Sequence, residues 1–325
     1  MPYNSIIDRT NDADALIPTD EARGIIKEVC DSSWLFRLAT KLQNMPTNVR
    51  TMPVMSALPI AYFVNGDTSL KQTTEVSWES KNITAEELAV IVPVPEAVLS
   101  DAEYDIWGEV RPALVDAFNV AINGAVLYGT NIPAAWTTDL GAAGLVAFAT
   151  AAGHTASIAA FDDIYGATLG ETADGAADGL LALIEADGFQ ATGHVAAVGV
   201  KARLRNCRDT DGNPIFVATP QAESSYALDG APCYFPDDGS IDSSEALLIS
   251  GDWRKLVYSF RQDITFKFLD QAVIQDAGGN IVYNLAQQDM VALRAVMRLG
   301  FALPNPINRM QQTEASRSPF AILTA

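Results

Sequence analysis

Leu88-Ala89-Val90-Ile91-Val92-Pro93-Val94-Pro95-Glu96-Ala97-Val98-Leu99-Ser100-Asp101 is the stretch that decides the fold, because it joins an apolar strand to a helix start. Proline lacks the N–H that a strand ladder needs, so Pro93 and Pro95 close the strand. Ser100 followed by Glu103 has the pattern of a capping box, in which the two residues satisfy the first free N–H groups of a helix. We predict a strand over residues 88–94 and a helix that starts at Ser100.

The helix predicted after this corner is long and has one continuous apolar face. Gly129 is typical of a helix end, and Pro112 predicts a kink or a restart. At about 1.5 Å per residue the helix over residues 102–128 is roughly 40 Å long. The apolar face follows gaps of three and four residues and consists of Trp107, Val110, Leu114, Ala117, Phe118, Ala121, Ile122 and Ala125.

Residues 46–83, upstream of the corner, have a different character. Pro46, Pro53 and Pro59 exclude a helix. Residues 60–64 and 73–78 are rich in β-forming side chains, and Asn65-Gly66-Asp67 between them is a turn signal. We predict a long two-stranded hairpin whose arms reach roughly 40–50 Å. Because an isolated hairpin is only marginally stable in water, we expect it to lie against a partner subunit.

The remaining segments predict mixed elements without regular β–α alternation, which indicates an α+β fold. Residues 1–18 predict an extended arm, Thr19 an N-cap, and residues 34–42 a continuation of the helical spacing. The tail beyond Pro304 predicts a second arm. Further predictions are a helix over 179–186, strands over 194–200, 246–250, 253–260, 264–269 and 290–301, and two elements around a turn within 204–217.

The composition limits the class of protein. The chain has 325 residues, 49% hydrophobic residues and a net charge of −19, so we expect more than one compact domain. A chain this acidic repels nucleic acid, and we expect no sequence-specific DNA binding. No apolar run reaches the length needed to span a bilayer, and residues 1–15 lack the features of a secretory signal, so we expect no membrane partner and synthesis in a cytosol.

Motifs for catalysis, cofactors and metals are missing from the sequence. Cys30, Cys207 and Cys233 form no CxxC pair, which argues against a disulfide framework or a zinc site. His154 and His194 are the two histidines, and no GxSxG or HExxH motif accompanies them. Residues 209–213 resemble the start of a calcium loop, but its twelfth position would be proline. We therefore predict no catalytic, cofactor-binding or metal-binding residue.

The order of the predicted elements resembles the major capsid proteins of tailed bacteriophages of the Hong Kong 97 type, from about Thr19 to Pro306. The quoted stretch is similar to the family's strand, proline corner and entry to its long spine helix. Residues 46–83 are similar to its extended loop, and residues 204–214, 228–232, 247–253 and 290–300 to later strands and turns. The resemblance implies a Hong Kong 97-type capsid fold and a shell subunit that is not an enzyme.

The resemblance also implies a division into domains. It comprises an N-terminal arm and helix over residues 1–45, the extended loop over 46–83, a peripheral domain from 84–140 and 251–305, an axial domain over 141–250, and a C-terminal arm over 306–325. The implied function is self-assembly, as hexamers and pentamers, into an icosahedral head that encloses double-stranded DNA. Implied partners are a portal, a decoration protein and, because the chain begins at its arm, a separate scaffolding protein or none. Its location would be the virion, after synthesis in the bacterial cytoplasm.

Tyr62, Phe63, Lys71 and Trp78 are the candidate inter-subunit contacts in the loop. The aromatic residues are chosen because aromatic side chains dominate interface energetics. Some family members cross-link a loop lysine to an asparagine, but no asparagine partner of Lys71 is identifiable here, and an ordinary exposed lysine is the simpler interpretation. The alternatives that stay open are a cellular nanocompartment shell of the encapsulin type, another phage structural part such as a tail tube, and a soluble hydrolase.

Overall fold

The computed structural model describes residues 33–64, 70–101, 106–161, 164–170, 179–208, 213, 226–276 and 278–325. Within these ranges the chain forms two compact units. The first unit contains residues 87–118 and 262–298, and the second contains residues 33–86, 119–261 and 299–325. The predicted N-terminal arm and the start of the helix predicted after Thr19 lie outside the described residues. The division into arms, loop, peripheral domain and axial domain stays a prediction.

A four-stranded sheet with the order β1-β10-β13-β4 contains the quoted strand. Its strands are β1 (Thr40–Lys41), β10 (Val257–Leu269), β13 (Met290–Ala302) and β4 (Glu86–Pro95). The first unit contains a small antiparallel sheet of β11 (Val273–Gln275) and β12 (Ile281–Asn284), followed by α10 (Leu285–Gln288). The strands predicted over residues 88–94, 264–269 and 290–301 are confirmed.

The corner after β4 is more helical than the sequence predicts. Residues after Pro95 form α3 (Glu96–Asp101), and α4 (Ile106–Tyr128) follows it. Ser100 lies inside α3, where its hydroxyl donates to the Ala97 carbonyl at 3.0 Å. The predicted N-cap at Ser100 is therefore wrong, because a serine within hydrogen-bond reach of the preceding turn bonds to it instead. Glu103 lies outside the described residues.

The long helix itself is confirmed, and it is a single element across Pro112 rather than two. Gly129 follows it with a φ of +69°. A Cβ there would meet the Ala143 carbonyl oxygen at 2.5 Å, so glycine ends the helix as predicted. By length and composition alone α4 could cross a membrane, which differs from our prediction that no segment is long enough. In the most apolar 18 residues of α4, 53% of the segment is buried inside the protein, as in the core helix of a folded domain.

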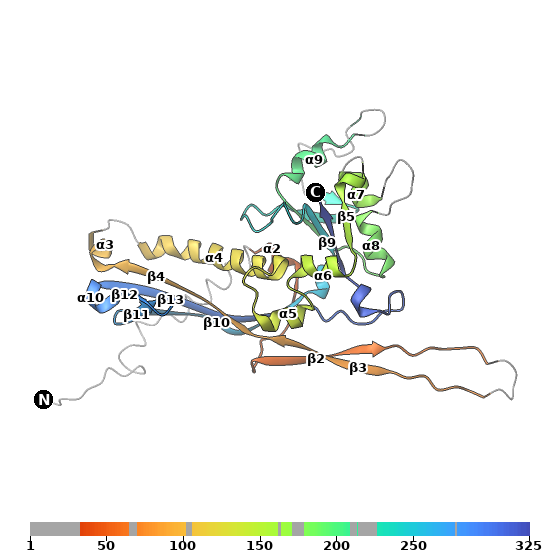
Figure 1. Ribbon diagram of the computed structural model, residues 1–325, viewed down its shortest axis with the longest axis horizontal. Coiled ribbons are helices and arrows are strands. Elements are labelled where there is room, and N and C mark those ends of the chain that lie inside the picture. The colour runs from red at the N-terminus through yellow and green to blue at the C-terminus, as the bar shows by residue number, and fades with distance from the viewer. Residues whose placement is uncertain are drawn as a thin grey trace. The chain divides into compact units, whose positions relative to one another are not determined.

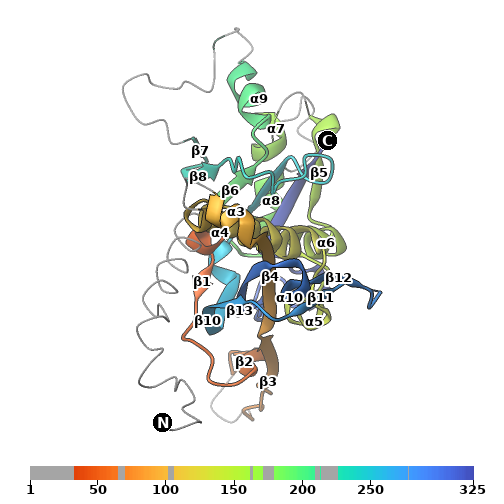
Figure 2. The same cartoon turned by 90° about the vertical axis from the view of Figure 1, so that its left-hand side faces the viewer.

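The second unit is built on a six-stranded sheet with the order β5-β14-β9-β6-β8-β7. Its strands are β5 (Thr155–Ser157), β14 (Phe320–Thr324), β9 (Leu248–Gly251), β6 (Gly193–Ala196), β8 (Ala231–Tyr234) and β7 (Ala227–Leu228). Helices α6 (Leu145–Ala151) and α8 (Leu180–Ala186) contact β14, and α7 (Ile164–Leu169) contacts α8 and α9 (Val200–Asn206), as Figures 1 and 2 show. This unit also contains two short helices, α2 (Trp34–Leu38) and α5 (Ala134–Leu140).

The C-terminal segment differs from the arm that we predicted. Residues 320–324 form β14, which is parallel to β5 and antiparallel to β9, and Phe320, Ala321 and Leu323 are fully buried. The apolar run of residues 320–323 forms an interior strand of the sheet between β5 and β9, and this burial outweighs the prolines and polar residues before it. The last residues of the chain therefore belong to the core of the second unit.

Four smaller predictions were wrong in their boundaries or in the kind of element. The strand predicted over residues 194–200 ends at Ala196, and α9 takes up Leu204, which we had placed in a strand. Residues 34–42 form α2 and then β1 instead of one helix. The strand predicted from Trp253 begins with a 3-10 turn, Trp253–Lys255, before β10. In each case a short apolar run fits either kind of element, and tertiary packing decides.

Candidate inter-subunit contact site

The candidate site is carried by a hairpin of β2 (Val49–Ala57) and β3 (Ser77–Thr84). The two strands are antiparallel, with Val49 opposite Thr84 and Met55 opposite Trp78, and an irregularity in register follows Met55. The hairpin is confirmed, but its paired strands lie mainly outside the two segments that we predicted, residues 60–64 and 73–78. The predicted turn at residues 65–67 lies outside the described residues.

The base of the hairpin is fixed to the second unit. Ile83 is completely buried and packs in a small apolar cluster with Met45, Ala85, Val257 and Ala302. The Thr84 carbonyl accepts a hydrogen bond from the Trp136 indole at 3.0 Å, and the Thr84 N–H donates to the Asp139 carboxylate at 2.7 Å. Burial raises the pKa of Asp139, and its hydrogen bonds from Thr84 oppose this shift. Because both backbone groups of Thr84 are held, the hairpin has a rigid origin.

Gly300 in β13 explains how closely the hairpin base approaches the sheet. A Cβ at this position would lie 2.5 Å from the Thr84 carbonyl oxygen and 3.0 Å from the Ile83 side chain. No side chain fits in that space, so glycine is required by the approach of one backbone to another. The sequence alone did not single out this glycine.

Beyond the paired strands, side-chain hydrogen bonds join the two arms of the hairpin. The Ser56 and Ser77 hydroxyls lie 2.8 Å apart, and the Ile60 N–H donates to the Thr74 hydroxyl at 3.0 Å. The Tyr62 hydroxyl donates to the Gln72 carbonyl at 2.9 Å. These contacts keep the arms side by side without a backbone ladder, as Figure 1 shows.

The four candidate residues are all exposed, and they do not form one cluster. Tyr62 and Phe63 lie on the first arm, Lys71 on the second, and Trp78 at the start of β3 opposite Met55. Phe63 is fully exposed and Trp78 is 66% exposed. Sequence reasoning missed further exposed apolar residues of the hairpin, namely Met55, Ile60, Val64 and Leu70. Ile60 and Val64 were within a predicted strand, but a short continuous apolar run is typical of a buried strand, so the local sequence carried no signal of their exposure.

The hairpin exposes several large apolar side chains to solvent, which is unusual for the surface of a folded protein. Several exposed large apolar side chains on one segment are more than the single scattered residues that are normal on a protein surface, and they indicate a binding surface. Tyrosine and tryptophan are enriched among the residues that dominate interface energies. The arrangement can therefore bind another surface, while it holds no nucleophile and base in mutual contact among its described residues.

The residues with catalytic potential elsewhere are engaged in the core. His194 is fully buried, with Nδ1 2.7 Å from the Ser250 hydroxyl and Nε2 3.1 Å from the Leu228 carbonyl, and burial lowers its pKa. Burial also lowers the pKa of His154, although Asp187 lies 3.1 Å away and favours the charged form. Burial raises the pKa of the Cys233 thiol to about 12. Within the described part of the chain, no group of three or more His, Cys, Asp or Glu residues could hold a metal ion.

An exposed apolar hairpin beside histidines that are buried in the core is typical of a structural subunit that associates with other chains. The sequence matches the phage capsid family over residues 13–308, and the chain belongs to that family. It is 26% identical to the major capsid protein of Staphylococcus phage 80alpha over 279 residues, which cover 85% of this chain and 78% of that protein.

Solved structures agree with this assignment. A chain from Microbacterium phage Oxtober96 has a TM-score of 0.74 at 33% sequence identity, covering 98% of this chain and 99% of that one. A chain from Mycobacterium phage Cain has a TM-score of 0.73 at 27% identity and covers 98% of both chains. The fold is the Hong Kong 97-type α+β fold that the sequence predicted.

Proposed function

We propose that this phage capsid protein is the major subunit of a tailed-phage head, which self-assembles as hexamers and pentamers into an icosahedral shell around double-stranded DNA. The observation that carries the proposal is the hairpin between residues 55 and 78. Seven large apolar side chains are exposed there: Met55, Ile60, Tyr62, Phe63, Val64, Leu70 and Trp78.

The physical argument starts from the cost of leaving this surface in water. Burying an aromatic or large aliphatic side chain contributes about 1.5–3 kcal/mol. These side chains are left exposed by their own unit, so another chain can cover them. When the hairpin of one copy covers a different surface of the next copy, the contact is heterologous, and such contacts form a ring when the rotation between copies closes. Hexamers and pentamers are rings of this kind.

The charge supports the proposed content of the shell. The chain carries −19, so a wall of these subunits repels DNA phosphates and leaves packed DNA free of sequence-specific contacts. The proposal places the protein in the virion after synthesis in the host cytoplasm. A portal, a scaffolding protein and a decoration protein are the further partners that membership of the capsid family suggests.

Two measurements on the full chain test the proposal. Sedimentation and negative-stain microscopy of the purified protein should show large closed particles, alone or with a scaffolding protein from the same phage. Native particles should absorb ultraviolet light with the 260-to-280 nm ratio of nucleic acid. Tubes or rings would indicate another structural part of a phage. Particles that contain protein but no nucleic acid, isolated from an infected or native source, would indicate a nanocompartment. A small monodisperse species would contradict a shell altogether.

Lys71 takes part in this proposal as a non-covalent contact. It is exposed on the second arm of the hairpin. On a denaturing gel, particles should dissolve into one band at 34.7 kDa. A ladder of covalent multimers that disappears in Lys71→Arg would show cross-linking instead, and our interpretation of Lys71 would be wrong.

A further inference from the structure

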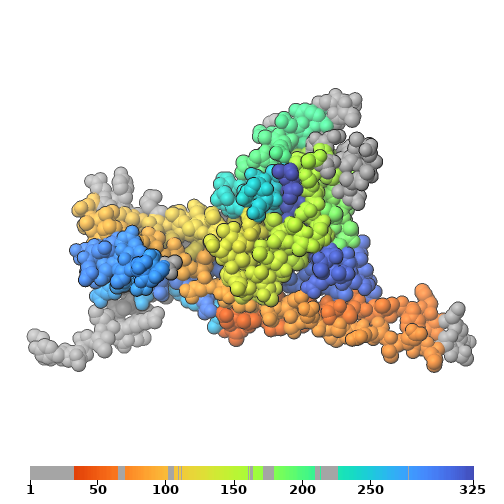
Figure 3. Space-filling model, in the orientation of Figure 1, coloured from red at the N-terminus to blue at the C-terminus, as the bar shows by residue number. Residues whose placement is uncertain are grey.

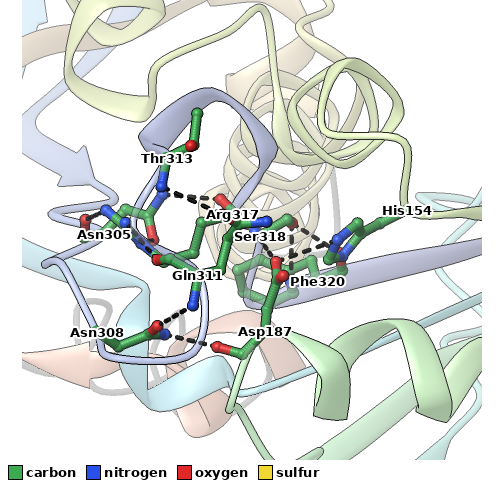
Figure 4. A network of polar contacts seen from close by, with 9 residues as sticks. All are labelled: His154, Asp187, Asn305, Asn308, Gln311, Thr313, Arg317, Ser318 and Phe320. Carbon is green, nitrogen blue, oxygen red and sulfur yellow. Dashed lines mark hydrogen bonds and ion pairs between the residues drawn. The ribbon is translucent and has the colours of Figure 1, made fainter.

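Residues 305–318, here named the C-terminal bracket, fold around one buried cation. Arg317 is 2% exposed, and its guanidinium donates to oxygens of the bracket itself. Nε donates to the Asn305 side chain at 3.1 Å, Nη2 to the Asn305 carbonyl at 2.7 Å, and Nη1 to the Gln311 carbonyl at 3.0 Å. The Asn305 amide donates back to the Arg317 carbonyl at 2.9 Å. Figure 4 shows these bonds closing the segment on itself.

The inner side of the bracket is fixed to the six-stranded sheet and its helices. Asp187, at the end of α8, accepts the Ser318 N–H at 2.8 Å on its carboxylate and the Asn308 amide at 2.6 Å on its carbonyl. The same carboxylate lies 3.1 Å from His154 Nε2. The Ser318 hydroxyl donates to the Phe320 carbonyl at 2.7 Å, which joins the bracket directly to β14. The bracket therefore has a rigid foundation in the core.

The outer side of the bracket contacts both arms of the hairpin. On the first arm, the Ile307 N–H donates to the Met55 carbonyl at 3.3 Å and Arg309 donates to the Pro59 carbonyl at 3.1 Å. On the second arm, Lys81 lies 2.7 Å from Glu314, and also 3.1 Å from Glu79. Figure 3 shows the dark blue atoms of this segment against the orange hairpin.

We propose that the C-terminal bracket sets the direction in which the hairpin leaves the second unit, and that Arg317 is the positioning residue that keeps the bracket folded. The inference rests on the proposed function, because it concerns how the apolar arms are presented to a neighbouring copy. A two-stranded ribbon that is fixed only at its base can still bend beyond that base. Contacts at Met55, Pro59 and Lys81, on both arms, remove that freedom.

The preorganisation has a consequence for assembly. An arm that already points at its partner loses less freedom on binding than one that samples many directions, so association is tighter for the same contacts. The bracket residues need not touch the neighbouring copy to have this effect. Loss of the outer contacts should therefore weaken assembly while the fold stays intact, because Lys81 and Glu314 are partly exposed and surface ion pairs contribute little to stability.

The test measures the direction of the hairpin in unassembled full-length chains. Spin labels on Leu70→Cys and Glu185→Cys, both exposed positions, report a distance from the outer hairpin to α8. Cys30→Ser removes one natural thiol, and Cys207 and Cys233 are buried. We expect one narrow distance distribution in the parent protein. In the variant Arg309→Ala with Glu314→Ala it should become at least twofold broader, with a thermal midpoint within about two degrees of the parent.

A matched control and a second variant complete the design. Arg205→Ala with Glu245→Ala removes the same two charge types at exposed positions away from the bracket, and it should leave the distribution unchanged. Arg317→Met should broaden the distance distribution as much as the Arg309→Ala and Glu314→Ala pair does. Arg317→Lys keeps the positive charge but loses the planar set of guanidinium donors, so it should restore the narrow distribution only in part. If Arg317→Met fails to fold, the outer pair still decides the question.

The outcomes separate this inference from the proposed function. If the distance distribution is unchanged in the variant with Arg309→Ala and Glu314→Ala, the proposed role of the C-terminal bracket is wrong, regardless of how well the variant assembles. A broadened distribution with a severalfold higher protein concentration needed for assembly supports both ideas. A broadened distribution with unchanged assembly supports the bracket and contradicts the role of the hairpin as the contact between subunits.

Discussion

Replacing Phe63 by serine should abolish assembly at ordinary protein concentrations and leave the isolated subunit as stable as before. Phe63 is fully exposed, so its ring contributes nothing to the core of the second unit. Substitutions at such surface positions change the free energy of unfolding by less than about 0.5 kcal/mol. The same exposure makes the whole ring available to a partner.

The expected size of the effect follows from the area that a partner would cover. Burying a phenylalanine completely contributes about 1.5–3 kcal/mol, and we take about 2 kcal/mol because serine keeps its Cβ. Each subunit donates one hairpin, so each subunit in the shell loses one such contact. Since 1.4 kcal/mol is a factor of ten, the concentration at which particles form should rise roughly 30-fold.

Light scattering across a dilution series measures that concentration, and circular dichroism on heating measures the stability of the subunit. Phe63→Tyr keeps the ring and is the matched control, which should assemble within about threefold of the parent. Assembly of Phe63→Ser at the parental concentration would refute the reasoning, because the ring would then stay in water in the particle. A large drop in the thermal midpoint would refute it in another way, by showing that the ring has a partner inside the subunit.

Three other predictions follow from the core and the charge. Gly300→Ala should lower stability by about 1–3 kcal/mol and the thermal midpoint by several degrees, whereas Gly199→Ala, with open space around it, should not. Burial lowers the pKa of His194 below 6.5, so the unfolded chain binds more protons in mild acid; stability should fall from pH 7 to pH 5, and His194→Gln should flatten that slope in thermal unfolding. Assembly followed by scattering should increase with salt, because each subunit carries −19 and the Debye length falls from about 10 Å at 0.1 M to about 3 Å at 1 M; a steady decrease would contradict this.

The strands and the long helix could be predicted because their signals are local. An apolar run closed by Pro93 and Pro95 has few alternatives to a strand, and the apolar face after it is long enough to specify one helix. The short segments could not be predicted equally well. Leu204 fits a strand or a helix by its neighbours alone, and only the packing of α9 on α7 decides between them.

The position of β14 shows a different limit of sequence reasoning. Its partner strands are residues 155–157 and 248–251, which are distant in the chain. Nothing in the sequence of residues 320–324 predicts that they pair with these strands. The same holds for the bracket. Arg317 appears in the sequence as an ordinary polar tail residue, and its burial depends on Asn305 and Gln311 folding around it.

The candidate contact residues were identified for a reason that the structure leaves intact, namely aromatic residues in a segment with no core of its own. What could not be predicted is their separation. Pairing begins at the base, with Val49 opposite Thr84, and extends to Met55 opposite Trp78, so Trp78 lies on the ladder while Tyr62 and Phe63 lie beyond it. Register is set by the whole pattern of the two strands and the base contacts, and a turn signal at residues 65–67 does not fix it.

The balance between charge and apolar surface explains why the contact should be made at the far part of the hairpin. Copies that carry −19 repel one another, but at physiological salt the repulsion decays over about 8 Å. Residues 57–64 contain no charged side chain, and an extended chain of this length reaches up to roughly 25 Å. That reach is about three screening lengths, so an uncharged arm can meet a neighbour while most of the carboxylates of the two copies remain screened from each other. A charge placed within this segment, as in Ala61→Glu, should therefore weaken assembly more than the same charge at Thr51 in the base, and equal effects at the two positions would show that net charge, rather than the local apolar surface, controls association.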